Sequence, residues 1–234
     1  MIYLSGKWHQ SFEGIDQSLS EYPPDHWHPD VMDCHPVGYL RQPIPCGQRD
    51  KRLPKRIPWA ADTGIYGNPD FKLEKYLSLL ESWVHMLDSC LFATAPDVVG
   101  DWTATLNRSR PVLAKIRQIG YPVALVTQDG ATVSEIPWDD IDGIFTGGST
   151  PWKLSEAAFS IITEANRRNI WTHMGRVNSW RRIKAAMAGG YKSVDGTYVA
   201  FGPDLNSVHV VNWIGQLKHQ PPLLLEGMVN GHPD

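Results

Sequence analysis

Short apolar runs alternate with longer amphipathic segments along most of this chain. From about residue 57 onward there are six such runs, namely IPWAA, CLFATAP, PVALVT, GIFT, IWTHM and KSV. An alternation of this kind is typical of βα units around a parallel sheet, because each strand is followed by a crossover that packs on the sheet. Two earlier runs, MIYLSG and PVGYL, bring the number of expected strands to eight.

The segments between these runs have helical periodicity. Apolar residues recur at steps of three and four in two sets, Leu73, Tyr76, Leu77, Leu80, Val84 and Leu87, and then Leu154, Ala157, Ala158, Ile161, Ile162 and Ala165. This spacing predicts two helices that each bury one stripe. The second has Ser149 or Thr150 as a cap and Pro151 in its first turn. A third helix is expected in SWRRIKAAMAGG, ending at Gly189 or Gly190.

Eight strands with intervening helices predict an α/β fold, a compact (β/α)8 TIM-type barrel, with an open doubly wound sheet as the competing architecture. At 234 residues the chain suits one barrel domain spanning residues 1–234. The stretch from about residue 8 to 56 departs from the pattern, since it is rich in proline, histidine and charge and contains EYPPDHWHPD and KRLPKR. We expect a long irregular region there that includes a functional loop.

Composition narrows the class of protein only partly. An apolar content of 42% is ordinary for a packed globule, and no apolar stretch approaches the roughly 18 to 20 residues of a membrane span. Three widely spaced cysteines, Cys34, Cys46 and Cys90, favour a reducing compartment, so a cytoplasmic protein without a membrane partner is expected. The net charge of −3 argues against an overall basic protein but leaves a local nucleic-acid-binding stripe open.

Polar or glycine residues follow each of the six runs. They are Asp62, Asp97, Gln128 with Asp129, Gly147 with Gly148, His173 to Arg176, which come after Ile170 and Trp171, and Asp195. In a (β/α)8 barrel all of these positions meet at the C-terminal mouth, where active sites of this architecture are built. A single aspartate after a strand commonly only caps the next helix. Six polar strand ends in succession favour a shared site.

Two of these carboxylates suit chemistry at a sugar carbon. One of Asp62 and Asp195 can attack an anomeric carbon while the other moves protons. Gly196 beside Asp195 removes side-chain bulk that would block the approach. Groups suited to the edge of a flat polar ring are expected nearby, at Asp97, Gln128, Gly147 and Gly148. A glycosidase pair and a catalytically silent barrel that binds nucleic acid are the alternatives.

The strand ends also resemble, in order, the motifs of a known family. ADTGIYGN, FATAPDVVGD, LVTQDG, FTGGS, THMGRVNS and SVDGT are similar to motifs of the tRNA-guanine transglycosylase superfamily, and most of all to the phage and bacterial DNA-guanine transglycosylases (DpdA-like) that place 7-deazaguanine bases in DNA. The resemblance covers about residues 57 to 200. It implies that Asp195 is the nucleophile and Asp62 the general acid/base. It also implies a base-binding set, namely Asp97, Asp101, Gln128, Gly147, Gly148, Met174 and Gly175.

The implied partners are DNA, guanine and a 7-deazaguanine base of the preQ0 type, in the cytoplasm of a bacterium or a phage-infected host. Basic residues expected at phosphates are Lys51, Arg52, Lys55, Arg56, Arg176, Arg181 and Arg182. Aromatic residues that could stack on bases are Trp59, Tyr66 and Trp102.

One departure from the family concerns metal. The tRNA enzymes carry a zinc site built from three cysteines and a histidine near the C-terminus, whereas no cysteine follows Asp195 here. This difference favours the DNA type and predicts no cofactor, because the usual zinc cysteines are missing. The group His26, His28, Cys34 and His35 is the alternative zinc site, although its spacing fits no standard ligand pattern. A zinc-less tRNA-guanine transglycosylase is the alternative.

Overall fold

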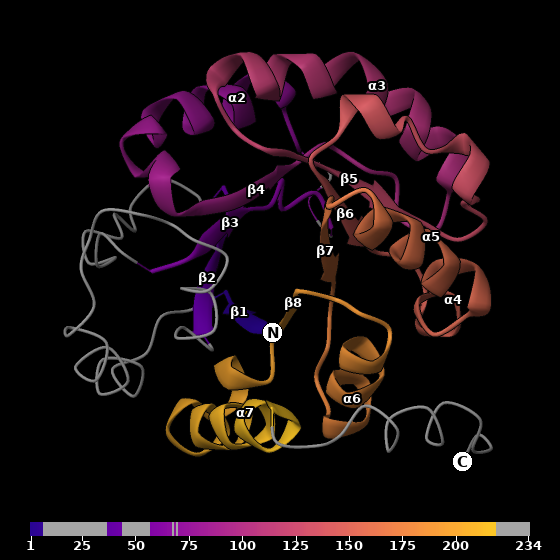
Figure 1. Ribbon diagram of the computed structural model, residues 1–234. Helices are drawn as coiled ribbons and strands as arrows, with labels where there is room; N and C mark the ends of the chain where they lie inside the picture. The colour runs from indigo at the N-terminus through magenta and orange to yellow at the C-terminus, as the bar shows by residue number, and fades with distance from the viewer. Residues whose placement is uncertain (7–36, 44–56, 67, 69, 219–234) are drawn as a thin grey trace.

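Eight parallel strands close into a barrel that helices surround (Figure 1). The computed structural model describes residues 1–6, 37–43, 57–66, 68 and 70–218. The strands follow one another around the barrel in chain order, and β8 pairs with β1 to close it. The predicted (β/α)8 barrel is therefore confirmed, and the open doubly wound sheet is excluded.

All eight apolar runs form strands. They are β1 (Ile2–Ser5), β2 (Val37–Arg41), β3 (Trp59–Ala61), β4 (Cys90–Thr94), β5 (Val123–Thr127), β6 (Gly143–Thr146), β7 (Trp171–Met174) and β8 (Ser193–Gly196). Alternate residues along the strands belong to two separate hydrophobic clusters. The smaller cluster, which includes Ile2, Leu4 and Phe92, fills the barrel, and the larger one lies between the strands and the helices. The period of two along a strand thus decides which side chains face the interior.

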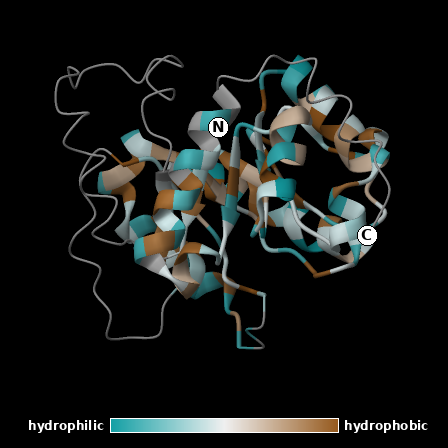
Figure 2. Cartoon of the chain, turned by 90° about the horizontal axis from the view of Figure 1, so that it is seen from below, coloured by the Kyte–Doolittle hydropathy of each residue, from teal (hydrophilic) through white to brown (hydrophobic). Residues whose placement is uncertain are grey.

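The helices pack on the outside of the barrel. They are α2 (Leu73–Ser82), α3 (Trp102–Ile119), α4 (Thr150–Lys153), α5 (Glu156–Arg167), α6 (Trp180–Ala188) and α7 (Pro203–Lys218), with short 3₁₀ segments η3 (Val84–Ser89), η4 (Val133–Glu135), η5 (Trp138–Asp140) and η6 (Val199–Phe201). Hydrophobic and hydrophilic residues are interleaved along them (Figure 2), as expected of helices that bury one stripe. Among the described residues, none of the helices has the length and apolar character required to cross a membrane.

Helix boundaries follow the caps. Ser149 accepts a hydrogen bond from the backbone N–H of Trp152, and Gly189 is the C-cap that follows the last residue of α6, both as predicted. The single helix predicted through Leu154 is wrong in one respect, because it is divided into α4 and α5. The hydroxyl of Ser155 caps a new helix by accepting from the N–H of Ala158, and Leu154 lies between the two. The first predicted helix similarly passes into the 3₁₀ segment η3 after Ser82.

Candidate active site

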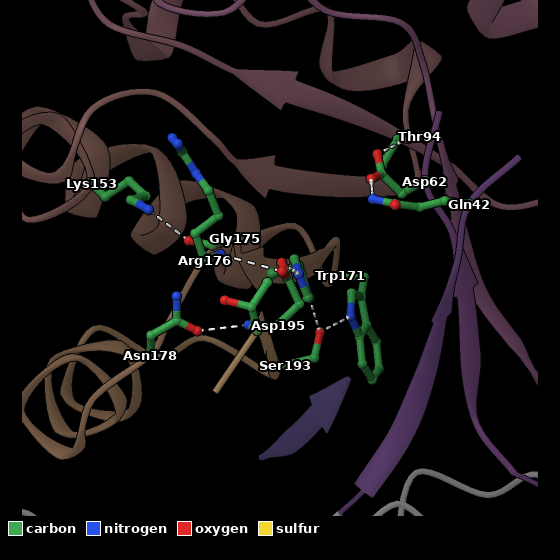
Figure 3. Close-up of polar contacts among 12 residues, drawn as sticks. Gln42, Asp62, Thr94, Lys153, Trp171, Gly175, Arg176, Asn178, Ser193 and Asp195 are labelled. Carbon is green, nitrogen blue, oxygen red and sulfur yellow. Dashed lines mark hydrogen bonds and ion pairs between the residues drawn. The ribbon is translucent and has the colours of Figure 1, made fainter. Parts of the chain in front are cut away.

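Carboxylates from separate strands meet at one end of the barrel. Asp62 directly follows β3, Asp195 lies within β8, and Asp97 follows β4. Since all the strands are parallel, their carboxyl ends share one mouth, and Figure 3 shows Asp62 and Asp195 on different sides of it. The negative charges of Asp195 and Asp97 both act on Asp62 and help to raise its pKa. Asp195 and Asp97 therefore both lie within electrostatic range of Asp62.

Asp62 is held by two neutral side chains. Its Oδ2 accepts a hydrogen bond from Nε2 of Gln42 at 2.6 Å, and its Oδ1 accepts from the hydroxyl of Thr94 at 3.4 Å. Withdrawal from bulk water raises the pKa of Asp62 to about 6, and the charges of Asp195 and Asp97 contribute, although the Gln42 bond offsets part of the rise. A carboxyl group with this pKa can both take up and release a proton near neutral pH.

Gln42 was not predicted as a site residue. It directly follows β2, whose apolar run was recognised in the sequence, so the rule that polar strand ends gather at the mouth applies to it as well.

Asp195 is held from the other side of the mouth. Its Oδ1 lies 2.9 Å from Nε2 of His173, and its Oδ2 lies 3.4 Å from the backbone N–H of Arg176. The His173 side chain is fully buried, whereas the Asp195 side chain keeps 13% of its surface exposed. Asp195 therefore has hydrogen-bond donors that stabilise a carboxylate, and it is also accessible from the mouth. His173 was noted only as part of a polar strand end, with no role assigned.

Glycine is required at two positions beside Asp195, for a different structural reason at each. A Cβ atom at Gly175 would lie 2.6 Å from the ring of Phe145 and 3.4 Å from Oδ1 of Asp195, so the close approach needs glycine. A Cβ atom at Gly196 would lie 2.3 Å from Oδ1 of Asn178 and 2.7 Å from the hydroxyl of Tyr3. The expectation that Gly196 opens the approach to Asp195 is therefore corrected, because successive strand residues face opposite sides and Gly196 makes room for packing outside the barrel.

The predicted base-edge residues Asp97 and Gln128 are brought together. Nε2 of Gln128 donates to Oδ2 of Asp97 at 2.6 Å, and Oε1 of Gln128 accepts from the backbone N–H of Gly100 at 2.9 Å. Both side chains are buried. Burial raises the pKa of Asp97, while the Gln128 bond and the charge of Arg108 act against the rise. The amide thus fixes the orientation of the carboxyl group.

Gly147 and Gly148 allow the chain after β6 to pass close to this pair. A Cβ atom at Gly147 would lie 2.7 Å from Nε2 of Gln128. Gly148 has a φ of +71°, and a Cβ atom there would lie 2.4 Å from the ring of Trp152. Neither position accepts a side chain, so backbone groups rather than side chains are presented at this part of the mouth.

Two predicted base-binding side chains lie elsewhere. Met174 is 1% exposed and packs in the cluster between strands and helices, because it alternates with the inward-facing His173 along β7. Asp101 is exposed and accepts a hydrogen bond from the backbone N–H of Ala104 at 2.9 Å, so its carboxylate caps α3. The prediction of a base contact is therefore corrected for both side chains, whereas Gly175 remains beside Asp195.

Cationic side chains tie together the loops after β6 and β7. Arg176 donates to the carbonyl of Gly148, and its guanidinium lies 5.0 Å from the ring centre of Tyr66. Arg182 donates to the carbonyl of Arg176 at 3.4 Å. Lys153, which sequence reasoning missed, is 2% exposed and donates to the carbonyl of Gly175 at 2.7 Å. Burial, with repulsion from Arg176, lowers the pKa of Lys153 to about 8.

The remaining predicted phosphate contacts fall into two groups. Arg181 is exposed. Four basic residues, Lys51, Arg52, Lys55 and Arg56, lie outside the described residues, as does the group His26, His28, Cys34 and His35. Within the described residues no set of three or more His, Cys, Asp and Glu side chains is placed to hold a metal ion.

Of the three aromatic residues expected to stack on bases, one is accessible. Trp59 and Trp102 are buried at 2% and 4% exposure, while Tyr66 is 64% exposed. Stacking by Trp59 or Trp102 is therefore excluded by their burial in the core.

Comparisons with known proteins add little to this geometry. No family model matches the chain, and no curated protein matches it. Solved structures that match include BlrP1 from Klebsiella pneumoniae in a calcium and cy-diGMP complex (14% identity, 61% of this chain, 38% of that chain, TM-score 0.38). A second is the EAL enzyme Bd1971 in a cAMP-bound form (13% identity, 60% of this chain, 40% of that chain, TM-score 0.37). A third is a mandelate racemase/muconate lactonizing enzyme-like protein from Rubrobacter xylanophilus DSM 9941 (12% identity, 83% of this chain, 56% of that chain, TM-score 0.42). This chain thus spans well under two thirds of the length of each.

Proposed function

We propose that this protein is an enzyme, a DNA-guanine transglycosylase that exchanges guanine in DNA for a 7-deazaguanine base through a covalent bond between Asp195 and the sugar. The observation that carries the proposal is the contrast between two carboxylates at one mouth. Asp62 has a pKa of about 6, suited to proton transfer, while Asp195 accepts from His173 and from a backbone N–H and so is suited to attack as a carboxylate. When two carboxyl groups in one site have such different surroundings, one typically transfers protons and the other acts as the nucleophile.

The proposed reaction consists of two displacements at C1′. The target guanosine is swung out of the stack, at a cost of a few kcal/mol. A carboxylate oxygen of Asp195 forms a bond to C1′ as the bond from C1′ to guanine N9 breaks, and the electron pair leaves with guanine, which Asp62 assists by donating a proton. The incoming 7-deazaguanine gives its ring N–H proton to Asp62, attacks C1′ and releases Asp195. Two inversions give overall retention.

Base recognition is assigned to the buried pair and the glycine backbone beside it. Asp97 and Gln128 form a fixed polar edge, and Gly147 and Gly148 bring backbone groups close to it. Tyr66, exposed and lying against the Arg176 guanidinium, is the aromatic group available for stacking on a neighbouring base.

The function is tested by label exchange. The protein is incubated with labelled guanine and either duplex DNA or tRNA, and the label retained in the polymer is counted. Label in DNA alone supports the proposal, and label in tRNA alone identifies a tRNA-guanine transglycosylase. Release of free sugar or abasic sites without label uptake identifies a hydrolase. No change in either polymer indicates a barrel that only binds.

Removing the base-reading carboxylate should weaken base binding. In Asp97→Ala the Nε2 group of Gln128 loses its buried partner, and a base loses an acceptor, at a cost of about 1 to 3 kcal/mol. The affinity for guanine, measured by calorimetry, is therefore expected to fall about 5- to 150-fold. Asp97→Asn, which keeps the shape, is the matched control for packing. An unchanged affinity in Asp97→Ala would remove this residue from base recognition.

The exposed Arg181 should contact phosphate. Because Arg176 and Arg182 already donate to backbone carbonyls, Arg181 is the predicted phosphate contact with the most accessible side chain among those described. Arg181→Ala is expected to reduce the slope of log affinity against log salt by about 0.7 to 0.9, as measured by fluorescence anisotropy with DNA. Arg181→Lys should keep the slope. Equal slopes in wild type and Arg181→Ala would place the phosphate track elsewhere.

A further inference from the structure

Four polar side chains form a continuous chain of hydrogen bonds inside the barrel behind Asp195. Trp171 and His173 lie two residues apart on β7, and Ser193 and Asp195 lie two residues apart on β8. His173 pairs with Ser193 in the register of these strands. The indole Nε1 of Trp171 is 2.9 Å from Oγ of Ser193 (Figure 3). Oγ of Ser193 is 2.8 Å from Nδ1 of His173, and Nε2 of His173 is 2.9 Å from Oδ1 of Asp195.

The indole sets the direction of every proton in this chain. An indole N–H is a donor only, so Oγ of Ser193 must accept from Trp171. The Ser193 hydroxyl then has its own hydrogen to give, and Nδ1 of His173 is the acceptor beside it. If Nδ1 carried the proton instead, Oγ would receive two donors and its hydrogen would have no partner within the chain. Full satisfaction of the four groups therefore places the imidazole proton on Nε2, where it is donated to Asp195.

The imidazole is fixed in place by aromatic packing. Its side chain has no exposed surface. The ring centres of Phe145 and Phe92 lie 4.5 and 5.2 Å from that of His173. A ring packed in this way cannot turn to exchange Nδ1 and Nε2, so the orientation of the donor at Asp195 is built into the barrel core.

We propose that His173 is a positioning residue, which uses the Trp171 and Ser193 hydrogen bonds to fix Oδ1 of Asp195 and to present Oδ2 as the attacking oxygen. This inference rests on the proposed function in that Asp195 attacks C1′. As the bond from Oδ2 to C1′ forms, Oδ1 becomes the carbonyl oxygen of the sugar ester and still accepts from His173. In the second displacement the same N–H stabilises the carboxylate that leaves C1′ with the bonding electron pair.

The direction of the chain can be measured without any substrate. In protein with ¹⁵N-labelled histidine, we expect His173 to be protonated on Nε2 and unprotonated on Nδ1 at neutral pH. Ser193→Ala, which removes the donor to Nδ1, should keep the proton on Nε2, because the Asp195 carboxylate can only accept, and should shift the Nδ1 resonance as that nitrogen loses its hydrogen bond. A wild-type His173 protonated on Nδ1 would overturn the proposal, whether or not the protein exchanges bases.

The kinetic test compares glutamine and asparagine at position 173, which carry the same amide group on side chains of different length. In His173→Gln the amide nitrogen reaches the position of Nε2, and in His173→Asn only that of Nδ1. We expect kcat for base exchange to stay within about tenfold of wild type in His173→Gln and to fall about 100-fold in His173→Asn and His173→Leu, with KM for the base unchanged. Thermal unfolding and circular dichroism verify the fold of each variant.

The outcomes separate this inference from the proposed function. Equal losses in His173→Gln and His173→Asn would show that His173 only supports packing, and would overturn the positioning role. A wild-type protein that exchanges no base in DNA or tRNA would overturn the proposed function itself, and the tautomer measurement would then decide the direction of the hydrogen-bond chain on its own.

Discussion

Replacing Asp195 with asparagine is expected to abolish base exchange while leaving the barrel intact. The amide has nearly the same shape and its oxygen can still accept from Nε2 of His173, but an amide cannot form the sugar ester. Loss of a covalent nucleophile should lower the rate at least ~10³-fold. Mass spectrometry of denatured reaction mixtures should detect a protein–DNA adduct with the wild type and none with Asp195→Asn.

A second aspartate at the mouth supplies the control. Asp129 follows β5, and its two carboxylate oxygens accept from the backbone N–H and the hydroxyl of Ser149 at 2.8 and 2.5 Å. Its role is to hold the turn that leads into α4, so Asp129→Asn should cost about 1 kcal/mol of stability and leave the exchange rate within about tenfold of wild type. Exchange by Asp195→Asn at a rate similar to that of Asp129→Asn would remove Asp195 from the role of nucleophile.

The fold could be predicted because its signals are local. Each strand is a short apolar run, and each run is followed by an amphipathic segment long enough to cross back over the sheet. Ser149 and Gly189 delimit helices through side-chain and backbone preferences that act within a few residues. Even the error at Leu154 is local, since Ser155 offers a second cap in the middle of an otherwise continuous apolar stripe.

The site could be predicted only as far as chain order determines it. That Asp62, Asp97, Gln128 and Asp195 share a mouth follows from parallel strands of a barrel. Which residue of a strand faces inward depends on how the barrel closes, and for this reason the inward His173 was passed over in favour of Met174.

Side-chain contacts between separate elements are still harder to predict from the sequence, because they depend on how the elements pack. The hydrogen bond from Ser193 to His173 requires the register of β7 against β8, and the contact of Lys153 with Gly175 requires α4 to pack beside the end of β7. Neither segment contains this information alone.

The second large effect is expected for Asp62→Asn, through proton transfer rather than covalent chemistry. Loss of a general acid/base typically costs about 10²- to 10⁴-fold in rate. With a pKa of about 6 for Asp62, kcat/KM of the wild type for the incoming 7-deazaguanine should fall as the pH drops below about 6, because the carboxyl group is then already protonated and cannot take the ring N–H proton. In Asp62→Asn the residual activity should lack this acid limb. A rate profile measured from pH 5 to 8 for both proteins tests the assignment, and an acid limb that persists in Asp62→Asn would assign it to another group.

The same substitution should make the protein more stable at neutral pH. The pKa of Asp62 is raised in the folded protein from an ordinary value of 3.8 to about 6, so the folded state binds this proton more tightly than the unfolded state does. The resulting stabilisation is fully present below about pH 4 and is lost as the pH rises through 6. Since the side chain is partly exposed, we expect solvent to reduce the effect to about 1 to 2 kcal/mol.

Asparagine is neutral at every pH and can still accept from Gln42. Urea unfolding at pH 7.5 should therefore find Asp62→Asn more stable than the wild type by that amount, with the difference vanishing toward pH 4, whereas a variant less stable than the wild type at pH 7.5 would mean that the folded protein favours the Asp62 carboxylate and that this residue is not tuned for proton transfer.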